Sequence, residues 1–262
     1  MTSMWRTSGW ILVGSALILA LSLGVRHGFG LFLAPMSSEF GWGRETFAFA
    51  IALQNLIWGL AQPFTGALAD RFGATKAVFV GGVLYAAGLV LMGMSDSAWS
   101  LSLSAGLLIG IGLSGTSFSV ILGVVGRAVA PEKRSMAMGI ASAAGSFGQF
   151  AMLPGTLGLI QWLGWSAALL VLGLMVALIL PLVSMLKDQP LPVLAGQQTL
   201  REALHEACGH SGFWLLAFGL FFGIYPEVAV IDWAAVFARD ILNVELALRS
   251  LPFAAFMVGM II

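Results

Sequence analysis

The chain has 262 residues, of which 59% are hydrophobic and only 9% are charged, and its net charge is zero. Soluble domains have about a quarter charged residues, so this composition excludes an ordinary soluble domain and predicts a membrane protein. The lack of a basic patch with interleaved aromatics argues against a nucleic-acid partner. The single cysteine, Cys208, excludes an internal disulfide and a cysteine-based metal site.

Long uncharged runs predict an all-α polytopic membrane protein, because each has the roughly 20 residues that a helix needs to cross a bilayer. The first four expected spans cover residues 10–34, 46–68, 77–95 and 97–126. The first run lacks a signal-peptide cleavage site and is interpreted as a retained span. The spans over 77–95 and over the second half of 135–186 have almost no strongly polar side chains, as expected of lipid-facing helices.

Residues 135–186 contain no charged side chain and are too long for one crossing, so they are divided at the interfacial aromatics of Gln161–Trp165. A polar stretch over 187–210 follows, with a short helical pattern from Leu200 to Ala207. A seventh span is expected over 211–237. The last apolar run is only about 13 residues long, too short to cross a membrane.

A short charged turn separates the second and third spans: Gly66-Ala-Leu-Ala-Asp70-Arg71-Phe-Gly73-Ala-Thr-Lys76. Its two glycines permit close helix approach and a positive φ. Asp70 can accept hydrogen bonds from a helix N-terminus or an arginine. Arg71 and Lys76 indicate the cytoplasmic face.

Counting lysines and arginines by side favours a cytoplasmic N-terminus. Eight then lie inside and three lie outside. The inner ones are Arg6, Arg71, Lys76, Arg127, Lys133, Arg134, Lys187 and Arg201, and the outer ones are Arg44, Arg239 and Arg249.

The turn over 66–76 resembles the signature of the major facilitator superfamily, in which it joins helices 2 and 3 and helps to hold the cytoplasmic gate. The resemblance implies two six-helix bundles joined by a linker. We therefore expect a first bundle over 1–186, a cytoplasmic linker over 187–210, and the truncated start of a second bundle over 211–262. The chain is thus expected to be a fragment of a longer protein.

Within that superfamily the chain resembles bacterial transporters of the monocarboxylate or oxalate/formate type. The residues behind this are Arg26-His27-Gly-Phe-Gly-Leu-Phe32, Phe40-Gly-Trp-Gly-Arg-Glu45 and Gln54-Asn55. Two features depart from the pattern. The fourth span lacks an early arginine, since residues 102–106 read Ser-Leu-Ser-Ala-Gly, and residues 226–240 look more like another branch.

Arg26 is the main candidate for binding a solute. A guanidinium inside a span is costly, so it should face a cavity or a partner. Gln54 and Asn55 are expected at a similar depth, and an arginine fork suits a carboxylate. The alternative is structural: Arg26 locks helices together through hydrogen bonds.

Three titratable groups are candidates for coupling transport to a proton. His27 titrates near neutral pH, although a lone histidine is more often a packing residue. Glu227 and Asp232 lie in the expected seventh span, where buried carboxylates can relay protons. If that span ends early, both simply lie at the outer interface.

Glycines are frequent in the fourth and fifth spans and predict close helix packing, with Thr116 or Gln149 lining a cavity as the minority alternative. The loop over 127–134 lies on the same face as Asp70. Either Arg127 or Arg134 is expected to pair with Asp70 when the inner mouth is shut. The alternative is a basic loop that contacts lipid headgroups.

The sequence therefore predicts a secondary transporter of a small organic anion in a bacterial cytoplasmic membrane, with lipid, solute and possible coupling protons as its partners. No metal-binding helix, nucleophile elbow or phosphate loop is present, which argues against an enzyme, a cofactor and an ATP-driven pump. A non-transporting sensor or scaffold on the same fold is the second candidate, and a membrane-embedded enzyme is the last.

Overall fold

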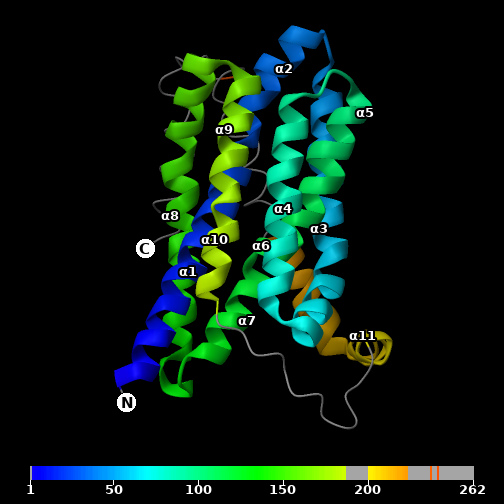
Figure 1. Cartoon of the computed structure of the whole chain (residues 1–262). Helices are drawn as coiled ribbons and strands as arrows, with labels where there is room; N and C mark the ends of the chain where they lie inside the picture. Colours follow the sequence, from blue (N-terminus) through cyan, green and yellow to red (C-terminus); the bar gives the residue numbers. More distant parts are fainter. Residues whose placement is uncertain (1, 187–199, 224–236, 238–240, 242–262) are drawn as a thin grey trace.

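The computed structural model describes residues 2–186, 200–223, Phe237 and Ile241. This part of the chain contains α-helices and short helical segments of other types and no strand. Six of its helical stretches are long and apolar enough to cross a membrane, and they stand side by side in one bundle (Figure 1). They cover Ser8–Phe40, Arg44–Phe72, Ala74–Gly93, Ala98–Ala128, Pro131–Leu163 and Trp165–Met185.

The first span is interrupted just after Arg26. Helix α1 (Thr2–His27) gives way to a 3₁₀ turn, η1 (Phe29–Phe32), and then to α2 (Leu33–Phe40). The predicted end at residue 34 is wrong, because Leu33 and Met36 are buried and keep the helix in the core as far as Phe40. Arg26 therefore lies near the middle of the span.

The second and third spans meet in a one-residue turn. Helix α3 (Arg44–Phe72) ends at Gly73, and α4 (Ala74–Gly93) begins directly after it. Gly73 has φ +94° and its N–H donates to the Ala69 carbonyl at 2.9 Å, so the expected positive φ is found there. Gly66 lies inside α3 with open space beside it, so the expected close approach at this position is absent.

The fourth span is one continuous run in the sequence but four segments in the structure. It comprises α5 (Ala98–Leu101), the π-helical η2 (Ser102–Leu108), α6 (Ile109–Thr116) and α7 (Phe118–Ala128). The extended backbone of Ser117 separates the last two segments. A π segment widens a helix locally and is frequent at functional sites.

The boundary between the fifth and sixth spans lies within Gln161–Trp165, where the interfacial aromatics predicted it. Helix α8 (Pro131–Leu163) and α9 (Trp165–Ala177) are separated by Gly164 with φ +81°, and α10 (Ile179–Leu182) and η3 (Val183–Met185) complete the sixth span. The expected linker helix is α11 (Leu200–Gly209). The helix Ser211–Gly223 begins the expected seventh span, whose residues 224–236 lie outside the described part.

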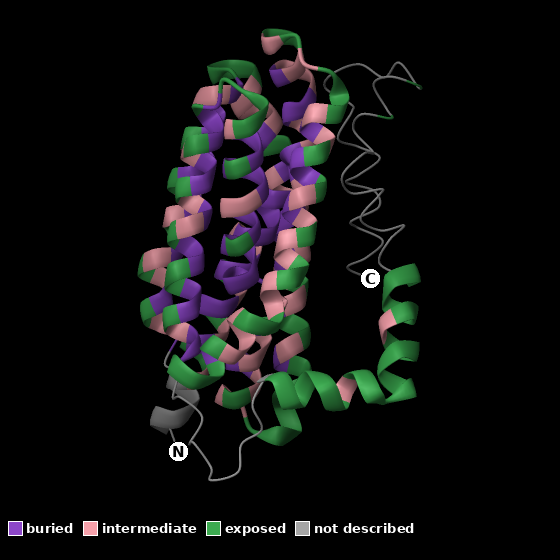
Figure 2. Cartoon of the chain, turned by 90° about the vertical axis from the view of Figure 1, so that its right-hand side faces the viewer, coloured by how far each residue is buried: buried purple, intermediate pink, exposed green. Residues whose placement is uncertain are grey.

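Buried residues lie mainly on the inner faces of the helices, and exposed residues lie mainly on the outside of the bundle (Figure 2). Helix α3 is the most exposed span, with only 22% of its apolar window buried, whereas the figure for α4 is 50%. Helix α4 thus has one buried face, and its other face has exposed apolar side chains, among them Phe79, Val80 and Leu91. A stripe of exposed apolar side chains follows α3 at four-residue spacing: Leu56, Leu60, Phe64 and Leu68.

Two helix crossings depend on glycine. Helix α1 packs along α8, where a Cβ on Gly148 would overlap the backbone of Ala20. Helix α4 packs against α6, where a Cβ on Gly81 would lie 2.8 Å from the Gly112 carbonyl oxygen. The predicted small-residue packing is confirmed at these crossings, but Gly139 of α8 has open space beside it.

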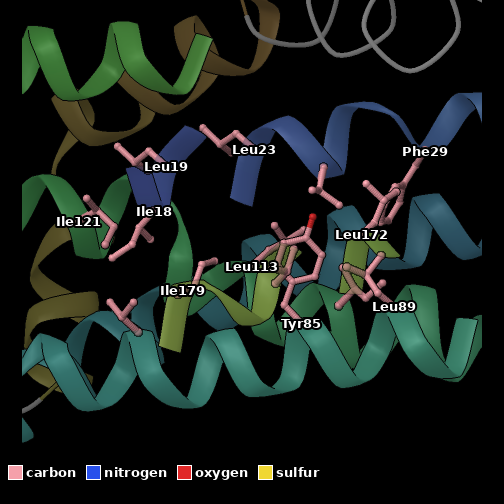
Figure 3. Close-up of a cluster of buried hydrophobic side chains, with 14 of the residues drawn as sticks. Ile18, Leu19, Leu23, Phe29, Tyr85, Leu89, Leu113, Ile121, Leu172 and Ile179 are labelled. Atoms are coloured by element: carbon pink, nitrogen blue, oxygen red, sulfur yellow. The ribbon is translucent and has the colours of Figure 1, made fainter. Parts of the chain in front are cut away.

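Tyr85 lies in the centre of the core formed by α1, α4, α6 and α9. Its side chain is fully buried close to Leu89, Leu113 and Leu172, and its hydroxyl points toward α1 (Figure 3). The core thus contains a polar group on α4 that hydropathy alone does not indicate.

Candidate functional site

Arg26 is buried in the middle of the bundle, with only 2% of its surface exposed. Its Nη2 donates to Asn55 Oδ1 at 2.9 Å, and its Cζ lies 5.9 Å from the centroid of the Phe29 ring. The structure thus brings Arg26 of α1 and Asn55 of α3 together at one depth. The amide oxygen accepts a hydrogen bond from the desolvated guanidinium, and the aromatic ring makes a cation–π contact with it.

Gln54 points elsewhere. Its side chain is fully buried, and its Nε2 donates to the carbonyl of Ala105 in the π segment at 2.6 Å. Its Oε1 is buried without a hydrogen-bond partner among the described residues. Gln54 therefore joins α3 to the fourth span and makes no hydrogen bond to Arg26.

A second polar layer lies one helical turn from Arg26 and joins α1, α4 and α6. The Ser22 and Thr116 hydroxyls are 2.8 Å apart, and Thr116 Oγ1 also donates to the Gly112 carbonyl at 3.2 Å. The Tyr85 hydroxyl donates to the Ser22 carbonyl at 3.0 Å. Thr116 is thus satisfied by protein groups. Sequence reasoning missed Ser22 and Tyr85, because a lone serine or tyrosine in an apolar run gives no periodic signal.

His27 is half-buried, and its Nδ1 lies 2.6 Å from the Leu23 carbonyl oxygen. Because a carbonyl can only accept, Nδ1 bears the proton and Nε2 is the basic nitrogen.

Gln149 is 6% exposed and follows the close contact of Gly148 with α1. Glu227 and Asp232 lie outside the described residues. Within the described part, no three His, Cys, Asp or Glu side chains form a candidate metal site.

The predicted contact between Asp70 and an arginine of the 127–134 loop region is present. Arg127 Nη1 lies 3.5 Å from Asp70 Oδ1 and links the end of α3 to the end of α7, with side-chain exposures of 32% and 56%. Arg71 stacks beside Phe72, with 5.2 Å between its Cζ and the ring centroid, and Lys76 and Arg134 are exposed. The gating role of the Asp70–Arg127 pair stays a prediction.

One contact at the other end of the bundle from the Asp70–Arg127 pair was not predicted. The Trp165 indole N–H at the start of α9 donates to the Glu39 carboxylate at the end of α2. Phe40 stacks on Trp42 at 4.4 Å and meets Trp165 edge-on at 5.7 Å. These aromatics tie the first span to the sixth.

Comparison with known proteins identifies the fold. The structure is similar to the crystal structure of a bacterial homologue of the human lysosomal transporter Spinster, in an inward-facing and unoccupied conformation, with a TM-score of 0.73 at 18% identity. That match covers 96% of this chain and 60% of the other. At this identity the likeness concerns the fold alone.

The sequence is similar to several curated transporters. It is 32% identical to monocarboxylate transporter 11 of Mus musculus over 166 residues, which are 63% of this chain and 37% of the relative. The human monocarboxylate transporter 11 is 31% identical over 192 residues, 70% of this chain and 40% of the relative. Monocarboxylate transporter 13 of Bos taurus is 34% identical over 62% of this chain and 38% of the relative.

The chain thus spans about two fifths of the length of these curated relatives. The family profile of the Major Facilitator Superfamily matches residues 5–262. This match agrees with the six spanning helices and with the charged turn between the second and third spans. The chain belongs to the Major Facilitator Superfamily, and it is an integral membrane protein.

Proposed function

We propose that the chain forms the first half of a secondary transporter that moves a small organic anion of the monocarboxylate kind by alternating access. The superfamily and the names of the relatives support transport rather than catalysis. The observation that carries the choice of an anion is the buried guanidinium of Arg26 in the middle of its span.

The hydrogen bond to the neutral amide of Asn55 helps to orient the Arg26 guanidinium. A guanidinium held in this way can offer two parallel N–H groups to a carboxylate. The break in the first span at Gly28 lies directly beside it, and interrupted helices commonly line binding cavities in transporters. The competing structural role, a cross-link between α1 and α3, predicts that Arg26 matters for stability and not for solute charge.

His27 is proposed as the coupling residue, with its basic Nε2 receiving the proton. Thr116, Gln149 and Gln54 are weaker candidates for contact with the solute, since Thr116 and Gln54 already bond to other helices. The Asp70–Arg127 pair is proposed to stabilise one of the two access states. The division into a bundle over 1–186, a linker over 187–210 and a second bundle from 211 follows the charge pattern and the resemblance.

The N-terminus is proposed to be cytoplasmic in a bacterial inner membrane, which the excess of inner lysines and arginines supports. Single cysteines placed in the 127–134 loop or at the Gly41 turn test this orientation. Membrane-impermeant reagents applied to intact cells should label only the Gly41 position. Labelling of the loop position instead would reverse the orientation.

The proposed transport is tested by uptake into proteoliposomes containing the full-length protein. Labelled short monocarboxylates, their neutral amides and an alkylamine are compared, with and without an inward proton gradient. Saturable uptake of the carboxylates alone is expected. It should be lost in Arg26→Gln and retained in Arg44→Gln, the same change at an exposed arginine. Equal uptake of amides and carboxylates would exclude an anion site, and no uptake of any solute would exclude transport.

A further inference from the structure

Gln54 makes a buried polar contact between helix α3 and the π-helical segment η2 of the fourth span. The side chain is fully buried, and its Nε2 donates to the Ala105 carbonyl at 2.6 Å. Because a carbonyl can only accept, the nitrogen of the amide and not its oxygen faces Ala105. The amide oxygen, Oε1, is buried without a hydrogen-bond partner among the described residues. What Gln54 contributes to this contact is therefore its donor group.

The π segment supplies the acceptor for this bond. In a regular α-helix the Ala105 carbonyl would accept from the N–H of Ile109, four residues further along the chain. In η2 the Ile109 N–H is directed instead to the carbonyls of Ser104 and Gly106. The Gln54 amide therefore takes the place of a backbone donor, and the irregular segment and the glutamine form one structural unit.

Gln54 also determines which way the next residue of α3 points. Successive residues of a helix are about 100° apart, so a bond that fixes the rotation of α3 at Gln54 fixes it at Asn55 as well. With Gln54 directed to the fourth span, Asn55 meets the first span, where its Oδ1 accepts from Arg26 at 2.9 Å. Leu56, one step further round the helix, is exposed. Rotation of α3 in either direction would move the Asn55 amide away from Arg26.

Stability alone gives little reason for an amide at this position. A buried acceptor without a partner costs free energy, and an apolar side chain would avoid that cost. The same two spans are already joined by the Thr65 and Ser114 hydroxyls, which are 2.7 Å apart. What the Gln54 amide adds is a directional bond one residue away from Asn55.

We propose that Gln54 is a positioning residue for the solute site: its bond to the Ala105 carbonyl aims Asn55 at Arg26, and Asn55 in turn orients the guanidinium for a carboxylate. This inference rests on the anion site proposed above. Gln54 acts through Asn55 and not by contact with the solute, because its side chain is enclosed between α3 and η2.

Equilibrium binding of labelled propionate to the full-length protein in detergent tests this role, with melting temperatures measured on the same preparations. Gln54→Leu should weaken binding about tenfold, the loss expected when the guanidinium fork is no longer oriented. Its melting temperature should be no lower than that of Thr65→Val, because the substitution also removes the unpaired acceptor. Thr65→Val removes the other hydrogen bond between the same spans and is the matched control, so it should keep wild-type affinity.

A conservative variant shows whether the donor group is what matters. Gln54→Glu has a carboxyl that can donate to the Ala105 carbonyl only when it is protonated. Relative to wild type at the same pH, its affinity for propionate should be unchanged in acid and reduced in alkali. Reduced affinity to the same extent at every pH would overturn the role of the donor.

A double substitution shows whether Gln54 acts through Asn55. In an Asn55→Leu background, Gln54→Leu should weaken binding no further, because the amide that Gln54 aims is absent. An additive loss, wild-type affinity in Gln54→Leu, or equal losses in Gln54→Leu and Thr65→Val would overturn the positioning role while Arg26→Gln still abolishes binding. Wild-type affinity in Arg26→Gln would overturn the anion site itself, and this role with it.

Discussion

At the scale of single residues, the main feature is a buried guanidinium inside the membrane that donates a hydrogen bond to an amide. Arg26 is 2% exposed and its Nη2 bonds to Asn55 at 2.9 Å. Desolvating a guanidinium is costly, and the hydrogen bond to the amide offsets part of that cost. A carboxylate that enters the site would interact more strongly with Arg26 than Asn55 does.

Replacing Asn55 by Asp separates the binding role of Arg26 from its structural role. A carboxylate at this position would pair permanently with Arg26, so the KM for a carboxylate solute should rise by at least about tenfold while the melting temperature stays the same or rises. Uptake kinetics and thermal unfolding of the same preparation measure both. Asn55→Leu should lower the melting temperature as well. A KM unchanged in Asn55→Asp would mean that the solute does not meet Arg26.

Tyr85→Phe tests the second polar layer. The ring remains in its cavity, but the hydroxyl no longer donates to the Ser22 carbonyl. The free energy of unfolding should fall by about 1 kcal/mol, with no change in KM. Chemical unfolding in detergent gives the first quantity and uptake gives the second. A change in KM without a loss of stability would place Tyr85 in the solute site instead.

The sequence predicted Arg26 and Asn55 at one depth, because a charge in an apolar run is conspicuous and depth can be counted along two helices, and the structure joins the two side chains by a hydrogen bond. The sequence did not show that Gln54, the neighbour of Asn55 in the chain, turns away to the Ala105 carbonyl. Successive residues of a helix point about 100° apart, so equal depth does not imply a common direction. The roles of Ser22 and Tyr85 depend on helix contacts that no local pattern encodes.

At the scale of helices, the bundle is held by crossings at which backbones touch. Gly148 and Gly81 mark two of these crossings, between α1 and α8 and between α4 and α6. In a bilayer such contacts provide dispersion energy that lipid tails cannot match at the same distance.

Gly148→Ala should destabilise the bundle by about 1–3 kcal/mol, because its Cβ would overlap the Ala20 backbone and force α1 away from α8. Gly139→Ala, in the same helix but with open space beside it, should be neutral or stabilising by up to about 1 kcal/mol. Thermal unfolding of the two variants in one detergent compares them. Equal effects at the two positions would contradict the close crossing.

The link between α3 and α7 is expected to act on the balance between access states rather than on stability. The Asp70–Arg127 pair is largely exposed, so Asp70→Asn should change the free energy of unfolding by less than about 1 kcal/mol. The uptake rate should nevertheless fall about fivefold or more. The charge swap, Asp70→Arg with Arg127→Asp, should recover part of that rate. Wild-type uptake in Asp70→Asn would exclude the gate.

Hydropathy predicted the six spans, because the apolar length needed to cross a membrane is a local property of the sequence, and the interfacial aromatics predicted the division within Gln161–Trp165. It did not predict the 3₁₀ turn after Arg26 or the π segment over Ser102–Leu108. Both lie at contacts between spans: Thr156 packs against Gly28, and α3 packs against Gly106.

At the scale of the whole molecule, the described bundle leaves large apolar faces uncovered. The stripe along α3 and the helix Ser211–Gly223 are exposed over most of their side chains. In a membrane protein such faces contact lipid or further helices. The superfamily match over 5–262 places the bundle in the Major Facilitator Superfamily.

The central claim is that the Arg26 guanidinium binds the transported anion. Equilibrium binding of a labelled short monocarboxylate to the purified full-length protein tests it most directly, with wild type, Arg26→Lys, Arg26→Gln and the exposed control Arg44→Gln compared in one detergent. The account predicts wild-type affinity in Arg44→Gln, affinity about tenfold weaker in Arg26→Lys, which loses the fork, and no saturable binding in Arg26→Gln. The same affinity in all four folded proteins would contradict it.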